Sequence, residues 1–124
     1  LHYQKPPFSQ SKLVRCVHGE VLDVVLDLRK NSDTFGLTVS TILSQDNKKQ
    51  LFIAKGFAHG FIVLSDSAII NYKVDNYYAP EHDRGIAFND TDLAINWQLS
   101  LDSLLLSNKD KNHPTLANAE DLFE

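Results

Sequence analysis

The sequence predicts an all-β fold, a sandwich or a barrel built from many short strands. Segments rich in β-branched and other apolar residues follow one another at short intervals, and turn residues separate them. Many short strands at this spacing are typical of sandwiches and barrels. The chain has 124 residues, enough for one domain with a modest core. Neither a repeat nor a linker divides it, so residues 1–124 are expected to form a single domain.

The expected strands follow in order along the chain. Residues 12–17 and 20–28 flank His18-Gly19, which indicates a hairpin with a tight turn. The other expected strands are 37–43, 50–54, 61–64, 67–78 and 85–88, separated by polar loops such as 45–49 and 79–83. Only the tail resembles a helix, because Pro114 and Thr115 form a plausible helix start before residues 116–123.

Alternation along two of these segments predicts which side chains share a face, because strand side chains repeat with a period of two. In 67–78, Tyr72 shares its face with Ala68, Ile70 and Val74 and is expected to point inward, whereas Lys73 points out. In 21–28, one face is entirely apolar and the other alternates valine with aspartate. The aspartate face is either solvated, which is the more common case, or lines a polar cavity.

Composition excludes several function classes. A net charge of −4 and a pI near 5.7 argue against a nucleic-acid surface, although a few local Lys and Arg side chains could still hold a small anion. Cys16 is the only cysteine, so the chain forms no intrachain disulfide or thiolate metal cluster, and Cys16 is expected to be a buried strand residue. No apolar run approaches membrane-spanning length and no signal peptide opens the chain. We therefore expect a cytoplasmic protein that contacts neither nucleic acid nor membrane.

A series of motifs in a fixed order resembles the dTDP-4-dehydrorhamnose 3,5-epimerase family. The motifs are Leu1-His2-Tyr3-Gln4, Gly56-Phe57-Ala58-His59-Gly60-Phe61, Tyr72-Lys73, Tyr77-Tyr78-Ala79-Pro80-Glu81-His82 and Leu106-Ser107-Asn108-Lys109-Asp110. No single motif is decisive, but the series covers nearly the whole chain. The resemblance implies a cupin-like jelly-roll barrel of antiparallel strands, here with a short C-terminal helix.

The resemblance also implies an activity. The family epimerises dTDP-4-keto-6-deoxy-glucose at C3 and C5, towards dTDP-4-keto-rhamnose, and uses neither a metal nor another cofactor. A base removes the proton next to the C4 ketone, and an acid returns a proton to the opposite face of the sugar. That chemistry requires two proton-transfer groups on opposite sides of the ring and stabilisation of the enolate oxygen.

Catalytic roles carry over to three residues. By resemblance His2 is the base, Asp110 orients its imidazole, and Tyr72 is the proton donor. Histidine suits the role because its ordinary pKa lies close to neutral pH. Each residue also has an ordinary structural interpretation: a solvated histidine, a surface-loop aspartate, and a core tyrosine with a satisfied hydroxyl.

Substrate-binding roles carry over to five more residues by resemblance. Lys12 and His59 match positions that contact the sugar or the enolate oxygen, and Lys109 matches a phosphate or sugar contact. Tyr78 matches an aromatic side chain that stacks on thymine, and Asp83 stands where the family usually has glutamate. A metal at His59 is not expected, because the cupin metal pattern requires a His-X-His pair and a following carboxylate.

The resemblance has one large departure, at the start of the chain. Family members carry Arg-Gly and several strands before the motif that contains His2, and this sequence opens at Leu1. We therefore expect a jelly roll without the family's N-terminal strands, with unpaired edges that favour a homodimer or aggregation and with weakened nucleotide binding. The alternatives are a single-centre 3- or 5-epimerase, another nucleotide-sugar cupin such as a 3,4-ketoisomerase, and a non-catalytic barrel.

Overall fold

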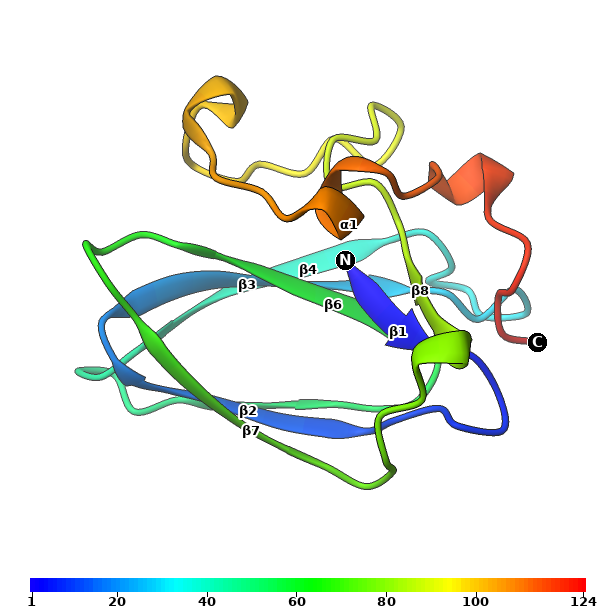
Figure 1. Ribbon diagram of the computed structural model, residues 1–124, viewed down its shortest axis with the longest axis horizontal. Helices are drawn as coiled ribbons and strands as arrows, with labels where there is room; N and C mark the ends of the chain where they lie inside the picture. Colours follow the sequence, from blue (N-terminus) through cyan, green and yellow to red (C-terminus); the bar gives the residue numbers. More distant parts are fainter.

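A computed structural model describes residues 1–124 as two antiparallel sheets that face each other (Figure 1). The larger sheet has the strand order β4-β3-β6-β1-β8, and the smaller has the order β5-β2-β7. The strands are β1 (His2–Gln4), β2 (Lys12–His18), β3 (Glu20–Asp27), β4 (Thr38–Ser44), β5 (Gln50–Ile53), β6 (Phe57–Val63), β7 (Ile69–Val74) and β8 (Asp83–Gly85). One helical turn, α1 (Asn108–Lys111), and three 3₁₀ turns complete the chain: η1 (Pro80–His82), η2 (Leu101–Ser103) and η3 (Leu116–Asn118). The predicted all-β jelly roll is confirmed.

Strand β3, which lies between β4 and β6, is buried on both faces. Its apolar face packs under the C-terminal third of the chain, which crosses the larger sheet on the side away from β2 and β7 (Figure 1). Its other face meets the smaller sheet, and there Asp23 and Asp27 are buried together with Val21. The interpretation of the aspartate face as solvated is therefore wrong. Other parts of the chain pack on both faces of β3, and the alternation of residues within the strand reveals only the face that is entirely apolar.

The hairpin predicted at His18-Gly19 is also wrong, although the turn itself is present. The strands on either side lie in different sheets, because β2 pairs with β5 and β7 whereas β3 pairs with β4 and β6. Gly19 has a φ of 78°, in the left-handed region that favours glycine, and a Cβ there would overlap the backbone oxygen of Ser67. The chain therefore turns a corner between the sheets at Gly19.

The helix predicted over residues 116–123 is reduced to the single turn η3. Beyond it the chain runs extended, and Phe123 forms a parallel bridge with Arg29 while its backbone N–H donates to the carbonyl of Leu28. Long-range pairing and burial of the apolar tail override the local helical pattern. The strand predicted over 85–88 likewise ends at Gly85, and β6 starts at Phe57, earlier than expected.

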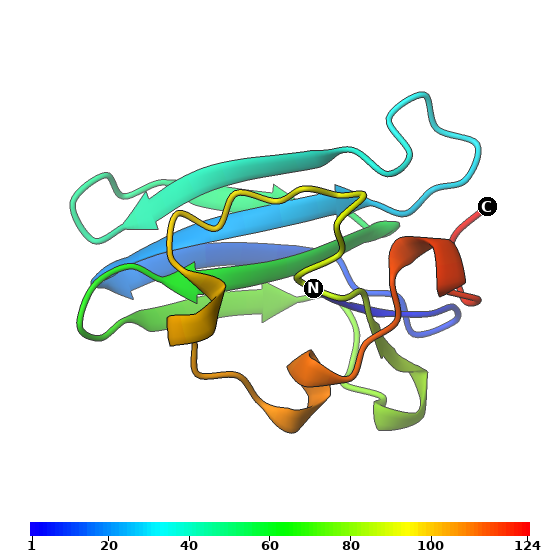
Figure 2. The same cartoon turned by 90° about the horizontal axis from the view of Figure 1, so that it is seen from above.

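Two further observations bear on the sequence predictions. Cys16 is buried in β2, as expected. No helix of the structure has the length and apolar character needed to cross a membrane. Seen from above, the start of the chain lies in the middle of the molecule, with α1 beside it (Figure 2). This placement brings β1 and α1, which are far apart in the sequence, to one site.

Candidate active site

An open cleft of about 1490 Å³ lies beside β1, β6 and β7 and extends to α1. The eight residues to which the sequence assigned catalytic or binding roles all line it: His2, Lys12, His59, Tyr72, Tyr78, Asp83, Lys109 and Asp110. They come from five strands, the loop before η1 and helix α1, so only the folded chain brings them together. The placement agrees with one shared site, while the role of each residue stays a prediction.

His2 and Asp110 form a close pair at the rim of this cleft. His2 Nε2 lies 2.6 Å from Asp110 Oδ1, across 108 positions of sequence. Ser107, the N-cap of α1, donates its hydroxyl to the other carboxylate oxygen at 2.9 Å. Burial alone would raise the pKa of Asp110, but the hydrogen bonds from His2 and Ser107 outweigh it and leave the pKa below its ordinary value. Asp110 is therefore a carboxylate that accepts the His2 N–H, which leaves Nδ1 of His2 as the basic nitrogen.

A second histidine–carboxylate pair lies on the floor of the cleft. His59 is the partner of His2 across β1 and β6, so both side chains point to the same face. His59 Nε2 lies 2.7 Å from Asp23 Oδ2, and both residues are buried. Asp23 Oδ1 is buried without a hydrogen-bond partner. Asp23 was not among the site residues predicted from the sequence. The available signal was the aspartate between two valines on a strand face.

Lys12 brings positive charge to this pair from the opposite sheet. It lies on β2 with the same parity as the buried residues Val14 and Cys16, so its side chain points between the sheets. Burial lowers the pKa of Lys12, and the nearby carboxylates Asp83 and Asp23 offset this only in part. A partly desolvated ammonium group of this kind binds an anionic oxygen more strongly than a fully hydrated one does.

Tyr72 faces the cleft from β7, as alternation predicted. Ala68 and Val74, on the same face, also line the cleft, and Lys73 is exposed outside it. The Tyr72 side chain is 60% exposed rather than buried, because the space between the sheets is open at this end. A phenol in this position can reach a ligand in the cleft, which a core tyrosine could not.

Tyr78, Asp83 and Lys109 are joined into one polar cluster at the mouth of the cleft. Lys109 Nζ lies 2.8 Å from Asp83 Oδ2 and 3.1 Å from the Tyr78 hydroxyl. The Asp83 carboxylate, followed by the Tyr78 hydroxyl, raises the pKa of Lys109 above its ordinary value. Asp83 Oδ1 is also 4.0 Å from His2 Nδ1. The cluster therefore ties α1 to β8 beside the candidate base.

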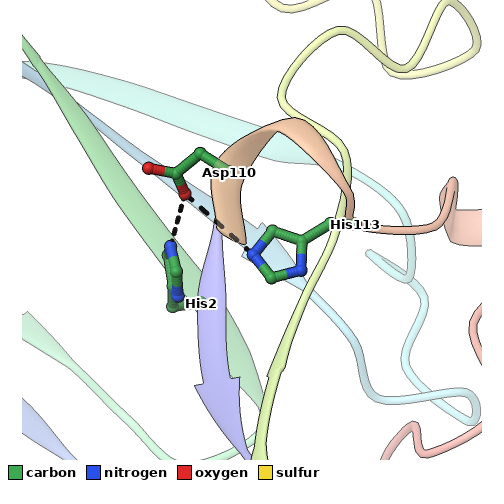
Figure 3. A group of neighbouring side chains, drawn as sticks. All are labelled: His2, Asp110 and His113. Atoms are coloured by element: carbon green, nitrogen blue, oxygen red, sulfur yellow. Dashed lines mark hydrogen bonds and ion pairs between the residues drawn. The ribbon is translucent and has the colours of Figure 1, made fainter. Parts of the chain in front are cut away.

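His113 lies beside the His2–Asp110 pair, and no sequence pattern had indicated it as a site residue. The His113 ring stands edge-on to His2, with centroids 5.0 Å apart and planes at 89°. Figure 3 shows one nitrogen of this ring, Nε2, directed at Asp110, and the distance to Oδ1 is 4.0 Å. The ring fits there because residue 85 is glycine, since a Cβ at Gly85 would overlap it. Burial, reinforced by the charge of His2, lowers the pKa of His113.

Comparison with known proteins gives one consistent result. A protein-family model described as dTDP-4-dehydrorhamnose 3,5-epimerase matches residues 1–118. A dTDP-4-dehydrorhamnose 3,5-epimerase of Escherichia coli K12 is 54% identical over 116 residues, which is 94% of this chain and 62% of that protein. The chain thus spans less than two thirds of the length of this relative.

Solved structures agree in fold. A dTDP-6-deoxy-D-glucose-3,5-epimerase from Legionella pneumophila, in complex with dTDP-4-keto-L-rhamnose, superposes with a TM-score of 0.92 at 47% identity, covering 97% of this chain and 63% of that one. A 3'-monoepimerase from Streptomyces bikiniensis, in complex with dTDP, superposes with a TM-score of 0.86 at 34% identity, covering 94% and 58%. That protein is a double variant in which a histidine and a tyrosine are replaced, and the same number of positions separates them as separates His2 from Tyr72.

Proposed function

The chain belongs to the dTDP-4-dehydrorhamnose 3,5-epimerase family, and we propose that it carries the residues that epimerise dTDP-4-keto-6-deoxy-glucose next to the ketone. The observation that carries the proposal is the His2–Asp110 pair at the rim of the cleft, with its 2.6 Å hydrogen bond. A carboxylate on Nε2 fixes the tautomer of His2, stabilises the imidazolium that forms, and leaves Nδ1 to take a proton. The Legionella relative, with a product-like keto sugar bound, supports this choice of substrate class.

Stabilisation of the enolate and return of the proton are assigned to other residues of the cleft. Loss of the proton next to the C4 ketone leaves an enolate, whose oxygen carries the negative charge. Lys12 and the His59–Asp23 pair supply positive charge and an N–H donor for that oxygen. Tyr72, on the smaller sheet, then donates its phenolic proton to the carbon from the side opposite His2. The proton is therefore removed on one face and returned on the other.

Nucleotide recognition is assigned to the cluster at the mouth of the cleft. Tyr78 is 60% exposed and offers a flat ring on which thymine can stack. Lys109 lies against that ring and carries a charge for the diphosphate. Phosphate binding would draw Lys109 away from Asp83, so the ion pair in the free protein competes with the ligand. The neighbouring carboxylate therefore weakens diphosphate affinity.

Solvent-deuterium exchange tests the proposed reaction. The chain is incubated in D₂O with dTDP-4-keto-6-deoxy-glucose, and deuterium at C3 and C5 is followed by NMR. His2→Ala should slow exchange at both carbons by about 100- to 10,000-fold, because it removes the base. Tyr72→Phe should retard net epimerisation more than the first exchange, because only reprotonation is impaired. Deuterium at one carbon alone would indicate the single-centre alternative.

A matched control keeps this experiment decisive. His18 is an exposed histidine at the end of β2 whose only side-chain bond is to Ser67, so His18→Ala should exchange at the parent rate. Equal exchange rates for the parent and His2→Ala would reject His2 as the base. Exchange that disappears in both His2→Ala and His18→Ala would point to misfolding rather than to catalysis.

Assembly and location belong to the same proposal. Homodimer formation is supported by exposed apolar side chains on edge strands, with Val39 of β4 68% exposed and Phe52 of β5 67% exposed. Sedimentation velocity at micromolar concentration tests it, and a sharp monomer boundary would reject the dimer. A cytoplasmic location stays a prediction.

A further inference from the structure

Three side chains from separate parts of the site direct one ligand-type atom each into a common space. They are His2 from β1, Asp110 from α1, and His113 from the segment that follows α1 (Figure 3). One ligand-type atom of each residue lies within 4.8 Å of the other two, and Asp110 Oδ1 is 2.6 Å from His2 Nε2 and 4.0 Å from His113 Nε2. Two imidazole nitrogens and one carboxylate oxygen form the three-residue set typical of zinc sites that keep a coordination position open.

The third member of the set has no other partner in the protein. Nε2 of His113 is buried and makes no hydrogen bond, and Asp110 Oδ1, 4.0 Å away, is too far for one. A buried nitrogen without a partner is uncommon and costs free energy. Packing nevertheless holds the ring in this orientation, between the His2 edge and the space above Gly85. Without a bound group, the chain holds a donor atom in position and leaves it unsatisfied.

The spacing of the three atoms fits a metal ion after small movements. Zinc binds nitrogen at about 2.0 to 2.1 Å, so neighbouring ligand atoms of a tetrahedral site lie about 3.3 Å apart. The observed 2.6 Å between His2 and Asp110 is shorter than this because a proton joins them, and the 4.0 Å between Asp110 and His113 is longer. A shift of the Asp110 carboxylate from His2 towards His113 evens out the two distances.

We propose that His2, Asp110 and His113 form a zinc site whose occupation blocks the candidate base. The ion takes the place of the proton on Nε2 of His2, and that proton moves to Nδ1, so His2 binds the metal as a neutral imidazole whose basic nitrogen is already protonated. His2 and Asp110 line the cleft, so the fourth coordination position opens to water or to an oxygen of a ligand. With its carboxylate partner bound to metal, His2 can no longer be oriented and stabilised as an imidazolium. The binding site follows from geometry alone, whereas its inhibitory effect rests on the proposed function.

Cobalt(II) absorbance tests the site without any need for turnover. Tetrahedral or five-coordinate cobalt absorbs strongly in the visible range, whereas hydrated octahedral cobalt is pale. The strong visible absorbance of the parent chain should reach its maximum at one equivalent of cobalt per chain. One equivalent of zinc should abolish that absorbance. The amino group of Leu1 is acetylated in every sample, because a free amine next to His2 would itself be a ligand.

His113→Phe is the decisive variant. Phenylalanine fills the space over Gly85 with a ring of similar size and removes only nitrogens that make no hydrogen bond in the structure. Zinc affinity measured by calorimetry should fall by more than about 100-fold, since loss of even a supporting residue around a metal costs 10- to 100-fold. His18→Asn, which alters an exposed histidine elsewhere, should bind zinc like the parent. Far-UV circular dichroism and thermal unfolding confirm that both variants are folded.

Other outcomes overturn the proposal. A parent chain whose cobalt spectrum stays octahedral has no such site. Zinc affinity equal in the parent and in folded His113→Phe means that any metal binds elsewhere. If the chain exchanges deuterium, micromolar zinc should inhibit the parent far more than His113→Phe, and equal inhibition would reject the block of the base. A chain that binds zinc through His113 but exchanges no deuterium would fail the proposed function and keep the metal site.

Discussion

Strand β3 carries two buried aspartates on the same face, Asp23 and Asp27, and the protein satisfies them in opposite ways. Asp27 Oδ1 accepts from the backbone N–H and Nε of Arg29, both at 2.9 Å. Its Oδ2 accepts from Arg29 Nη2, Ser32 and Thr34 at 2.6 to 2.8 Å. Asp23 has a single bond, to His59, and its Oδ1 has no partner.

The difference shows how one strand can serve both stability and chemistry. A carboxylate whose lone pairs are all used binds the loop after β3 and has no capacity for a ligand. Asp23 keeps one oxygen free and lies next to His59, which lines the open cleft. Its carboxylate can therefore stabilise positive charge that forms on the imidazole. We therefore infer that Asp27 holds the fold and that Asp23 positions His59. Measurements of turnover and of stability in variants of each aspartate distinguish the two roles.

The largest expected effect is on turnover in Asp23→Asn. The amide keeps the size of the side chain but no longer stabilises positive charge on His59 next to the enolate oxygen, so kcat should fall by about 100- to 1000-fold. Stability should change by less than about 1 kcal/mol, because one hydrogen bond to His59 can persist. Turnover by NMR and unfolding in urea measure the two quantities. A large loss of stability with unchanged kcat would assign Asp23 to the fold instead.

Asp27→Ala should show the reverse pattern. Loss of the carboxylate leaves Arg29, Ser32 and Thr34 without their common acceptor, and we expect a loss of about 3 kcal/mol in the free energy of unfolding. The fraction that stays folded should turn over near the parent rate. Asp33→Ala, at an exposed position of the same loop, should cost less than about 0.5 kcal/mol. Equal losses in the two variants would contradict the anchoring role.

The pH dependence of stability sharpens the same contrast. The hydrogen bonds from Arg29 in particular hold the pKa of Asp27 well below its ordinary 3.8, despite burial that would raise it. A lowered pKa stabilises the fold fully above about pH 4, and this contribution is lost as the pH falls, because the unfolded chain then binds the proton first. Between about pH 4 and pH 2 the parent should therefore lose stability more steeply than Asp27→Asn, by up to about 1.4 kcal/mol per pH unit. Urea unfolding across this range provides the measurement, and parallel curves would refute the assignment.

Ser107→Ala should have the smallest effect. Ser107 caps α1 by accepting from the backbone N–H of Asp110 at 3.2 Å, and its hydroxyl donates to the Asp110 carboxylate. Loss of an N-cap costs about 1 kcal/mol, so kcat should fall by less than about tenfold. Ser103→Ala is the matched control, because the Ser103 hydroxyl at the end of η2 donates to the carbonyl of Ser100 and makes no hydrogen bond to His2 or Asp110. A fall as large as that of Asp23→Asn would mean that the cap, rather than the carboxylate, limits the reaction.

Local patterns in the sequence predicted the strands better than their partners. Alternation identified the apolar face of β3 and the inward direction of Tyr72, because both depend on a period of two within one strand. It could not show that Asp23 is buried, since a second sheet covers that face. It also suggested a hairpin at Gly19, because a tight turn looks the same whether the next strand pairs locally or enters another sheet.

The site was predictable only as far as the family motifs reach. They supplied His2, Tyr72 and Asp110, which no local pattern would have joined across 108 positions. Asp23 had a weak signal in its alternation with valines. His113 had none, because its place depends on the missing side chain of Gly85, a residue far from it in sequence. The residues around His113 in the sequence therefore do not indicate that its ring fits over Gly85.

The position of Trp97 makes its fluorescence a probe of the folded structure and of the cleft. It is the only tryptophan in the chain, and it belongs to the C-terminal third that crosses the larger sheet. Its side chain is buried in the core against β3, and its indole N–H donates to the carbonyl of Phe88 at 2.8 Å. Trp97 also lines the cleft. Its fluorescence therefore comes from one environment that both unfolding and cleft occupation disturb, and a red shift of emission marks release of this segment from the larger sheet. Quenching without a shift marks a ligand that reaches the indole while the segment stays in place.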